Sequence, residues 1–123
     1  MANTVPFKLI TPTKVVFEGD AELIIAVTTE GEEGILPRHA PFLGALKPGV
    51  VRANVAVDGK TQRLELATRE GFMQALPDRV TILVDEAVTF GDVNVAKTHD
   101  ELAHATTQSE IDFANAKLRL TGH

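Results

Sequence analysis

The chain contains no cysteine, tryptophan or tyrosine, and its only serine is Ser109. Without cysteine there are no disulfides, which fits a reducing compartment. The common Ser and Cys nucleophile arrangements lack a member, because Ser109 stands where a helix cap is expected. No glycine-rich loop precedes a Lys-Ser or Lys-Thr pair, so the phosphate-binding loop of NTPases is missing. We therefore expect no catalytic residues and no enzyme activity in this chain.

Excess positive charge is also lacking. Twelve Lys and Arg residues face seventeen Asp and Glu residues, giving a formal net charge of -5, and the basic residues are scattered. This argues against nucleic acid and anionic lipid as partners. No apolar run approaches the roughly 20 residues that span a bilayer, and the N-terminus has no signal-peptide pattern. The composition predicts a cytosolic globular protein without direct membrane insertion.

From Val5 to about Phe90, short apolar runs alternate with polar residues and are broken by Pro, Gly and Asp, which predicts a flattened β-sandwich or barrel of about eight to ten strands. We expect Lys14 to Glu18 to form one strand and Gly19-Asp20 to turn the chain into the next, Ala21 to Thr28. Residues 23–27 are apolar at every position, which predicts a central strand covered on both faces.

A hairpin is predicted at Asp58-Gly59, the two-residue turn that right-twisted strands prefer. Its register places Ala53 opposite Leu64 and Val51 opposite Leu66, with Arg52 opposite Glu65 on the other face. Apolar side chains then face apolar ones, and we expect the charged pair to form an ion pair across the strands.

After Gly91 the period changes to that of a helix. Asp92 is expected as the N-cap of a first helix, Ser109-Glu110-Ile111-Asp112 resembles a capping box that begins a second, and Gly122 is expected to end it. The join contains neither Gly nor Pro, so a helical hairpin and one long helix both remain open. We predict two domains, a β-sandwich at 1–90 and a C-terminal antiparallel helical hairpin at 91–123.

No metal site is predicted. His99 and His104 are the nearest pair of histidines, but five positions along a helix place them about 140° apart, so they cannot bind one ion from the same face.

The most unusual stretch runs from Glu30 to Pro41 and reads EGEEGILPRHAP. Its glycines permit tight turns, while Pro37 and Pro41 fix φ on either side of His39. We expect a stiff, exposed loop with Glu32 and Glu33 at its tip. Such a loop presents side chains to a partner and does not enclose a reaction pocket.

This stretch, its continuation Phe42-Leu43 and Ala45-Leu46-Lys47-Pro48-Gly49, and the later segments Glu70-Gly71-Phe72-Met73 and Val80-Thr81-Ile82-Leu83-Val84 resemble the epsilon-subunit family of F-type ATP synthases. The resemblance covers the β part from about Phe7 to Ala87 and, more weakly, the helical tail. It implies the same architecture, a sandwich followed by a helical hairpin.

The resemblance implies a non-catalytic subunit of the rotating central stalk, at the cytoplasmic face of the bacterial inner membrane. It would dock on the gamma subunit and the ring of c subunits and couple proton translocation to ATP synthesis elsewhere in the complex. Glu32 matches a position that faces the c ring, and His39 matches one at the gamma interface. The predicted interface residues are Glu32, Glu33, Arg38, His39, Pro41 and Phe42.

In this family the helical tail can extend toward the catalytic alpha and beta subunits and block hydrolysis. Here Lys117 and Arg119 are the cations of the second helix that would meet acidic surfaces there. The positions of the family's nucleotide motif include Asn94 and Lys97, where Asp and Arg are usual, and this departure weighs against ATP binding. We therefore predict no cofactor. The alternative is a free-standing β-sandwich module that recognises a ligand or peptide in a pocket near His39.

Overall fold

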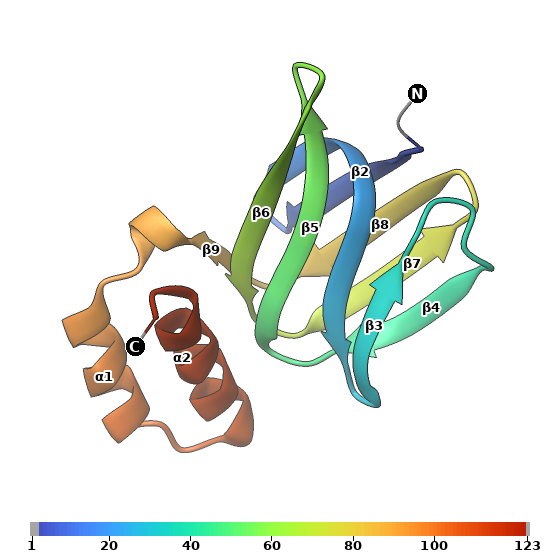
Figure 1. The fold of residues 1–123 in the computed structure, drawn as a ribbon. Helices are drawn as coiled ribbons and strands as arrows, with labels where there is room; N and C mark the ends of the chain where they lie inside the picture. The colour runs from blue at the N-terminus through green and yellow to red at the C-terminus, as the bar shows by residue number, and fades with distance from the viewer. Residues whose placement is uncertain (1–2, 123) are drawn as a thin grey trace.

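The computed structural model describes residues 3–122, and within them nine strands form two layers that are followed by helices (Figure 1). One layer holds β3 (Gly31–Ile35), β2 (Lys14–Thr28), β5 (Gly49–Val57), β6 (Lys60–Thr68) and β9 (Ala87–Thr89). The other holds β4 (Phe42–Leu46), β7 (Gly71–Leu76), β8 (Arg79–Val84) and β1 (Val5–Thr11). A 3-10 turn η1 (Phe90–Asp92) leads to α1 (Val95–Ala103) and α2 (Gln108–Leu120). The predicted sandwich with two C-terminal helices is confirmed.

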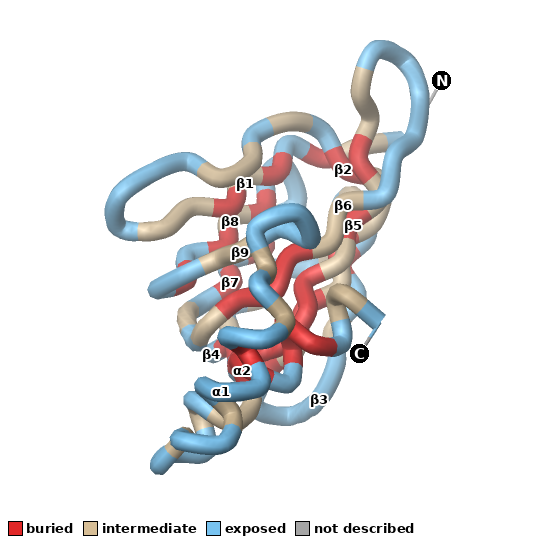
Figure 2. The backbone as a smooth tube through the Cα atoms, turned by 90° about the vertical axis from the view of Figure 1, so that its left-hand side faces the viewer, coloured by how far each residue is buried: buried red, intermediate tan, exposed pale blue. Residues whose placement is uncertain are grey.

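The two layers are joined into a flattened barrel. β1 pairs in parallel with β8 and antiparallel with β2, so it closes one side, and a single bridge between Thr28 and Leu46 connects β2 to β4 on the other. Buried residues alternate with more exposed ones along the strands (Figure 2). This is the period of two expected when one face of each strand packs into the core between the layers. The largest of these fully buried side chains are Phe7, Leu9, Ile24, Ile35, Leu66, Met73 and Ile82.

The prediction of a turn at Gly19-Asp20 is wrong, because β2 runs without interruption through these residues. Gly19 serves packing instead. A Cβ atom there would lie 3.0 Å from the ring of Phe17, which packs at 5.7 Å from the ring of Phe7. The glycine thus makes room for an aromatic pair. β2 pairs first with β1 and then with β5, and the register of the β2–β5 pairing shifts between Ala21 and Leu23.

The prediction that β2 is central is confirmed, because its C-terminal half pairs with β3 on one side and β5 on the other. The prediction that both its faces are covered is confirmed for the inner face and holds only in part for the outer face. Ile24 and Ala26 are buried between the layers, whereas Leu23, Ile25 and Val27 on the outer face are only half-buried. The reason is the position of α2, which packs against β5 and β6.

The hairpin at Asp58-Gly59 forms as predicted, with both residues at positive φ, 52° and 77°. Its register is confirmed, since Ala53 pairs with Leu64 and Arg52 pairs with Glu65. The prediction of an ion pair between Arg52 and Glu65 is wrong, however.

Arg52 reaches over β2 to Glu32 at 2.6 Å, and Glu65 binds Arg63 at 2.9 Å. The register determines which backbone groups pair, but it does not determine the ion pairs, because long side chains can reach residues other than their cross-strand neighbours.

The helical region is a hairpin and not one long helix, with α1 packed against α2. Both predicted N-caps are displaced. Asn94 rather than Asp92 caps α1, and Thr107 rather than Ser109 caps α2 by accepting a hydrogen bond from the Glu110 amide. These side chains lie three residues before the amides that they bind, as capping requires.

Gly122 follows the end of α2 with φ of 81°, in agreement with its predicted role.

Candidate docking surface

The segment between β3 and β4 contains a tight turn from Leu36 to His39. The amide of His39 donates to the carbonyl of Leu36 at 3.1 Å, Pro37 occupies the second position of the turn, and Arg38 has φ of 64°. Proline followed by a residue of positive φ defines a type II turn, in which glycine is the usual third residue. Arg38 holds a left-handed backbone without being glycine, and its exposed side chain donates to Asn3 at 3.3 Å.

His39 is oriented by two contacts. Its Nδ1 donates to the Ala40 carbonyl at 2.7 Å, since a carbonyl can only accept, and its Nε2 then lies 3.9 Å from a carboxylate oxygen of Glu33. The side chains are 32% and 35% exposed respectively, so neither is enclosed. The imidazole is fixed at the surface of the loop with one edge toward solvent and one toward β3.

The expectation that Glu32 and Glu33 form the tip of a loop is wrong, because both lie within β3. Neighbouring residues of a strand point to opposite faces, so the two carboxylates diverge: Glu33 meets His39, and Glu32 meets Arg52. The tip of this hairpin is Thr29-Glu30. Glycine at position 31, with φ of 119°, supports this turn and not a loop around the acids.

The remaining predicted interface residues differ in their availability. Pro41 is exposed, whereas Phe42 is half-buried, turned inward and packed against the core. Phe42 therefore supports the sandwich from inside, and its role at an interface stays a prediction.

The structure shows a larger surface feature that sequence reasoning missed. Five apolar residues are cross-strand neighbours and form one row across the outer face of β4, β7, β8 and β1 and onto the start of β2. We call this the apolar row, and its members are Ala45, Phe72, Leu83, Ile10 and Val15. Phe72 is 58% exposed and Leu83 43%. Leu43, 73% exposed, lies two residues before Ala45 on the same face.

The signal for this row was available in the chain. Met73 and Ala75 alternate with Phe72, and Ile82 and Val84 alternate with Leu83, so both exposed residues occupy positions where a one-sided strand carries polar side chains. A contiguous exposed apolar patch on a folded domain marks an interaction site.

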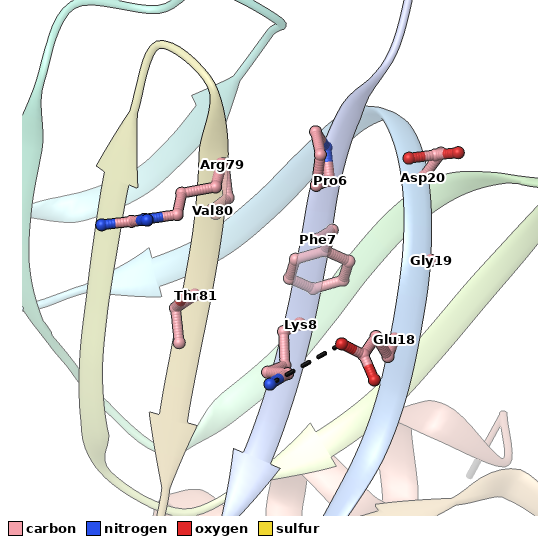
Figure 3. A pocket seen from close by; sticks show the side chains of 9 residues that line it. All are labelled: Pro6, Phe7, Lys8, Glu18, Gly19, Asp20, Arg79, Val80 and Thr81. Atoms are coloured by element: carbon pink, nitrogen blue, oxygen red, sulfur yellow. Dashed lines mark ion pairs between the residues drawn. The ribbon is translucent and has the colours of Figure 1, made fainter.

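The opposite end of the same face is polar. A hollow of 380 Å³ lies over β8, β1 and β2, where Lys8 forms an ion pair with Glu18 at 3.6 Å (Figure 3). Arg79 and Asp20 line it from its two sides and point away from each other. Apart from the ion pair of Lys8 with Glu18, the titratable groups that line the hollow do not converge on one point, so the hollow lacks the geometry of a general acid and base acting together.

The helical hairpin docks on the sandwich through a small second cluster. Phe113 and Ala116 of α2 pack against Val50 and Ala67, with Val88 and Leu120 at the edge. The Phe113 ring, 2% exposed, lies between two cations: the Arg69 guanidinium at 4.4 Å and the Lys117 ammonium at 4.6 Å from its centroid. Cations over an aromatic face are attracted by its quadrupole. Lys117 and Phe113 both belong to α2, so only the contact from Arg69 of the sandwich helps to hold the hairpin in place.

Of the two cations predicted for an inhibitory tail, only Arg119 is exposed. Lys117 is buried, 8% exposed, and its Nζ donates to Glu101 of α1 at 2.8 Å. This hydrogen bond from Lys117 lowers the pKa of the Glu101 carboxyl.

Asn94 and Lys97, the positions of the nucleotide motif, shape the start of α1: the Asn94 side chain accepts from the Lys97 amide at 3.0 Å.

The other residues that the sequence analysis considered for chemistry lie in or beside the two helices. Ser109 lies in the first turn of α2, and its hydroxyl donates to Glu70 at 2.6 Å. His99 and His104 are both exposed on α1 or directly after it, and no group of three potential metal ligands gathers among residues 3–122. No helix in that part of the chain has the length and hydrophobicity needed to cross a membrane.

A flattened barrel followed by a docked helical hairpin places the chain in the class of small β-sandwich proteins with a C-terminal helical hairpin. Residues 4–90 match the model of the ATP synthase delta/epsilon chain β-sandwich domain. The chain belongs to the ATP synthase epsilon chain family.

Similar chains support this assignment over nearly the whole length. The ATP synthase epsilon chain of Halalkalibacterium halodurans is 37% identical over 123 residues, covering 95% of this chain and 90% of that one. That of Hyphomonas neptunium is 35% identical over 124 residues, covering 100% and 90%. The Chromobacterium violaceum epsilon chain is 33% identical over 118 residues, covering 90% and 83%.

Two solved structures share the fold. A chain in the Euglena gracilis mitochondrial ATP synthase OSCP/F1/c-ring assembly superposes with a TM-score of 0.67 at 17% identity, covering 98% of this chain and 78% of that one. A chain in the Tetrahymena thermophila mitochondrial ATP synthase central stalk and c-ring structure gives 0.62 at 18% identity, covering 96% and 91%.

Proposed function

We propose that this chain is a non-catalytic rotor subunit that docks on the gamma subunit and the c ring of an ATP synthase and couples proton translocation to ATP synthesis. The apolar row is the observation that carries the proposal. Exposing Phe72, Leu83 and their neighbours to water has an unfavourable free energy, and a partner that covers these side chains removes it. Membership in the epsilon chain family and solved relatives within central-stalk and c-ring assemblies support the same partners.

The two contacts are assigned to different parts of the sandwich. The outer face with the apolar row, together with the turn that carries Arg38 and His39, is assigned to gamma. The Thr29-Glu30 turn and Glu32 lie at the other end of β3 and are assigned to the c ring. The two regions adjoin, because the Thr29 amide donates to the carbonyl of Ala45 of the row at 3.2 Å. The paired strands form one rigid body that can contact both partners and transmit force between them. The site of action is the cytoplasmic face of the bacterial inner membrane, as a peripheral part of the complex.

The docked hairpin corresponds to a form of the tail that does not inhibit hydrolysis. Lys117 is held by Glu101 and by the Phe113 ring, so it is not available to the alpha and beta subunits. Inhibition by this tail requires that the contacts of Phe113 with Arg69, Val50 and Ala67 are broken first.

The test is a binding titration of gamma with the isolated chain and with a matched pair of variants. Phe72→Ala removes the only aromatic side chain of the five-residue row and should weaken gamma binding about tenfold or more, as truncation of buried aromatic anchors does. Phe90→Ala is the control, because Phe90 is similarly exposed, at 65%, but lies in η1 beyond the row. Equal affinities for wild type and Phe72→Ala, or a folded wild type that does not bind gamma, would refute the proposal. Binding of a small ligand near His39 in place of gamma would favour the free-standing recognition module.

A further inference from the structure

A groove of 510 Å³ lies where the apolar row approaches the start of α2. Its floor is apolar and includes Phe72 and Leu83 of the row together with Leu46 and Pro48. Its other wall is formed by Gln108, Ser109 and Asp112 of α2. The groove therefore spans the joint between the sandwich and the helical hairpin.

The joint itself is held by few interactions. Ser109 donates to Glu70 at 2.6 Å, and Phe113 and Ala116 form the small apolar cluster with Val50 and Ala67. Isolated helical hairpins of this length are marginal, since most helical stability in proteins comes from tertiary packing. A partner that contacts both sides of the groove would add to these few interactions.

The groove carries excess negative charge. Three carboxylates, those of Glu70, Asp85 and Asp112, line it against one ammonium, that of Lys47. Glu70 is occupied by Ser109 and Asp112 accepts from Gln108 at 2.8 Å, so both already have neutral partners that leave their charge uncompensated. Apolar floor and acidic rim together fit a segment that presents apolar side chains next to Lys or Arg.

We infer that the gamma surface that covers the apolar row continues into this groove with a cationic segment, contacts α2, and so clamps the helical hairpin onto the sandwich. The inference rests on the proposed function. Phe72 and Leu83 belong to both the row and the groove, so a partner that covers the first reaches the second. Docking on gamma and docking of the tail are then coupled, because the bound partner stabilises only the form in which α2 lies beside Phe72.

The first measurement needs no variant. Hydrogen exchange of the α2 amides is followed in the isolated chain and in its complex with gamma. The clamp predicts that exchange across residues 108–120 slows about tenfold or more in the complex. Unchanged exchange of α2 in a complex that protects β4 and β7 would overturn the inference and leave the proposed function standing.

The second measurement tests the charge. Asp85→Asn combined with Asp112→Asn should weaken gamma binding about three- to tenfold at low salt, and the loss should shrink as salt rises, since exposed ion pairs are worth little each and are screened. The matched control is Asp58→Asn combined with Asp100→Asn, which removes two charges outside the groove.

If the two double variants bind gamma with equal affinity and equal salt dependence, the inference that a cationic segment of gamma enters the groove is overturned. A dimer of the chain that forms through the same carboxylates would assign the groove to a second copy instead. Failure of wild type to bind gamma at all would remove the proposed function itself, so the two failures are distinguishable.

Discussion

One residue of the candidate docking surface, Arg38, has an unusual left-handed backbone conformation. Arg38 has φ of 64°, which costs a non-glycine residue about 1 kcal/mol, and Pro37 before it fixes the turn in which this φ is required. A strained residue in an exposed turn suggests that its side chain, and not only its backbone, is needed.

Arg38→Gly is therefore expected to stabilise the free chain by up to about 1 kcal/mol, less the contribution of the exposed hydrogen bond to Asn3. The same change should weaken gamma binding, because the guanidinium is lost. Thermal unfolding and a gamma titration on the same sample check the two effects. A destabilised variant with unchanged affinity would contradict the account of this turn.

Gly71 is the second residue with a sharp requirement. A Cβ atom there would lie 1.9 Å from the Leu83 carbonyl oxygen and 2.7 Å from the Val84 Cα, and backbone cannot move aside as a side chain can. Gly71→Ala should destabilise the sandwich by about 3 kcal/mol.

Gly91→Ala is the matched control, because nothing lies within 4 Å of a Cβ at that position. Denaturant unfolding should separate the two variants; similar midpoints for both would show that the β7–β8 pairing is looser than described.

At the scale of elements, the sequence predicted strands better than the partners of side chains. The Asp58-Gly59 turn and the alternation of Val51 and Ala53 were enough to place β5 against β6 in the correct register. Periodicity reports which face of a strand is buried, and turn chemistry reports register, so both are encoded locally.

The site was predicted less well, because it depends on non-local pairing. Glu32 and Glu33 were placed at a loop tip, since glycines on both sides suggested a turn, but pairing with β2 makes the segment a strand. Strand alternation indicates that Phe72 and Leu83 are exposed. That they join residues of three other strands in one row follows only from the order of the strands. In α2, local patterns predict the presence of the helix and its end at Gly122, but they do not show that Phe113 and Ala116 form the face that meets the sandwich.

The contact between α1 and α2 should depend on pH through Glu101. Its pKa is lowered from 4.5 in the folded chain by the hydrogen bond from Lys117, so the unfolded state binds the proton more tightly. The stabilisation from this pair is fully present above the unfolded pKa and is lost as pH falls through the lower, folded value.

Hydrogen exchange of α1 amides in a titration below pH 5 should show this loss in wild type, and Glu101→Gln should abolish the pH dependence of this local stability. The same dependence in both would assign the loss of stability to other carboxylates.

The whole molecule divides, in our proposal, into a sandwich at 1–90 and a hairpin at 91–123. The large core lies entirely among the strands, and the hairpin contributes only to the small cluster around Val50 and Ala67. A chain that ends at Asp92 should therefore fold cooperatively, with a free energy of unfolding lower by about 2–3 kcal/mol for the apolar surface that α2 leaves exposed.

Urea unfolding followed by far-UV circular dichroism checks this division. Loss of the cooperative transition in the truncated chain would show that sandwich and hairpin form one folding unit. If the transition is retained, gamma binding by the truncated chain then measures how much of the docking surface belongs to the sandwich alone.

The most direct test is side-chain footprinting of the chain, free and within the assembled synthase, with hydroxyl radicals. The account predicts that Phe72, Leu43 and Leu83 are labelled in the free chain and strongly protected in the complex, while Phe90 is labelled similarly in both. Equal labelling of Phe72 in the free and assembled states would contradict the assignment of the apolar row as the surface that meets the stalk.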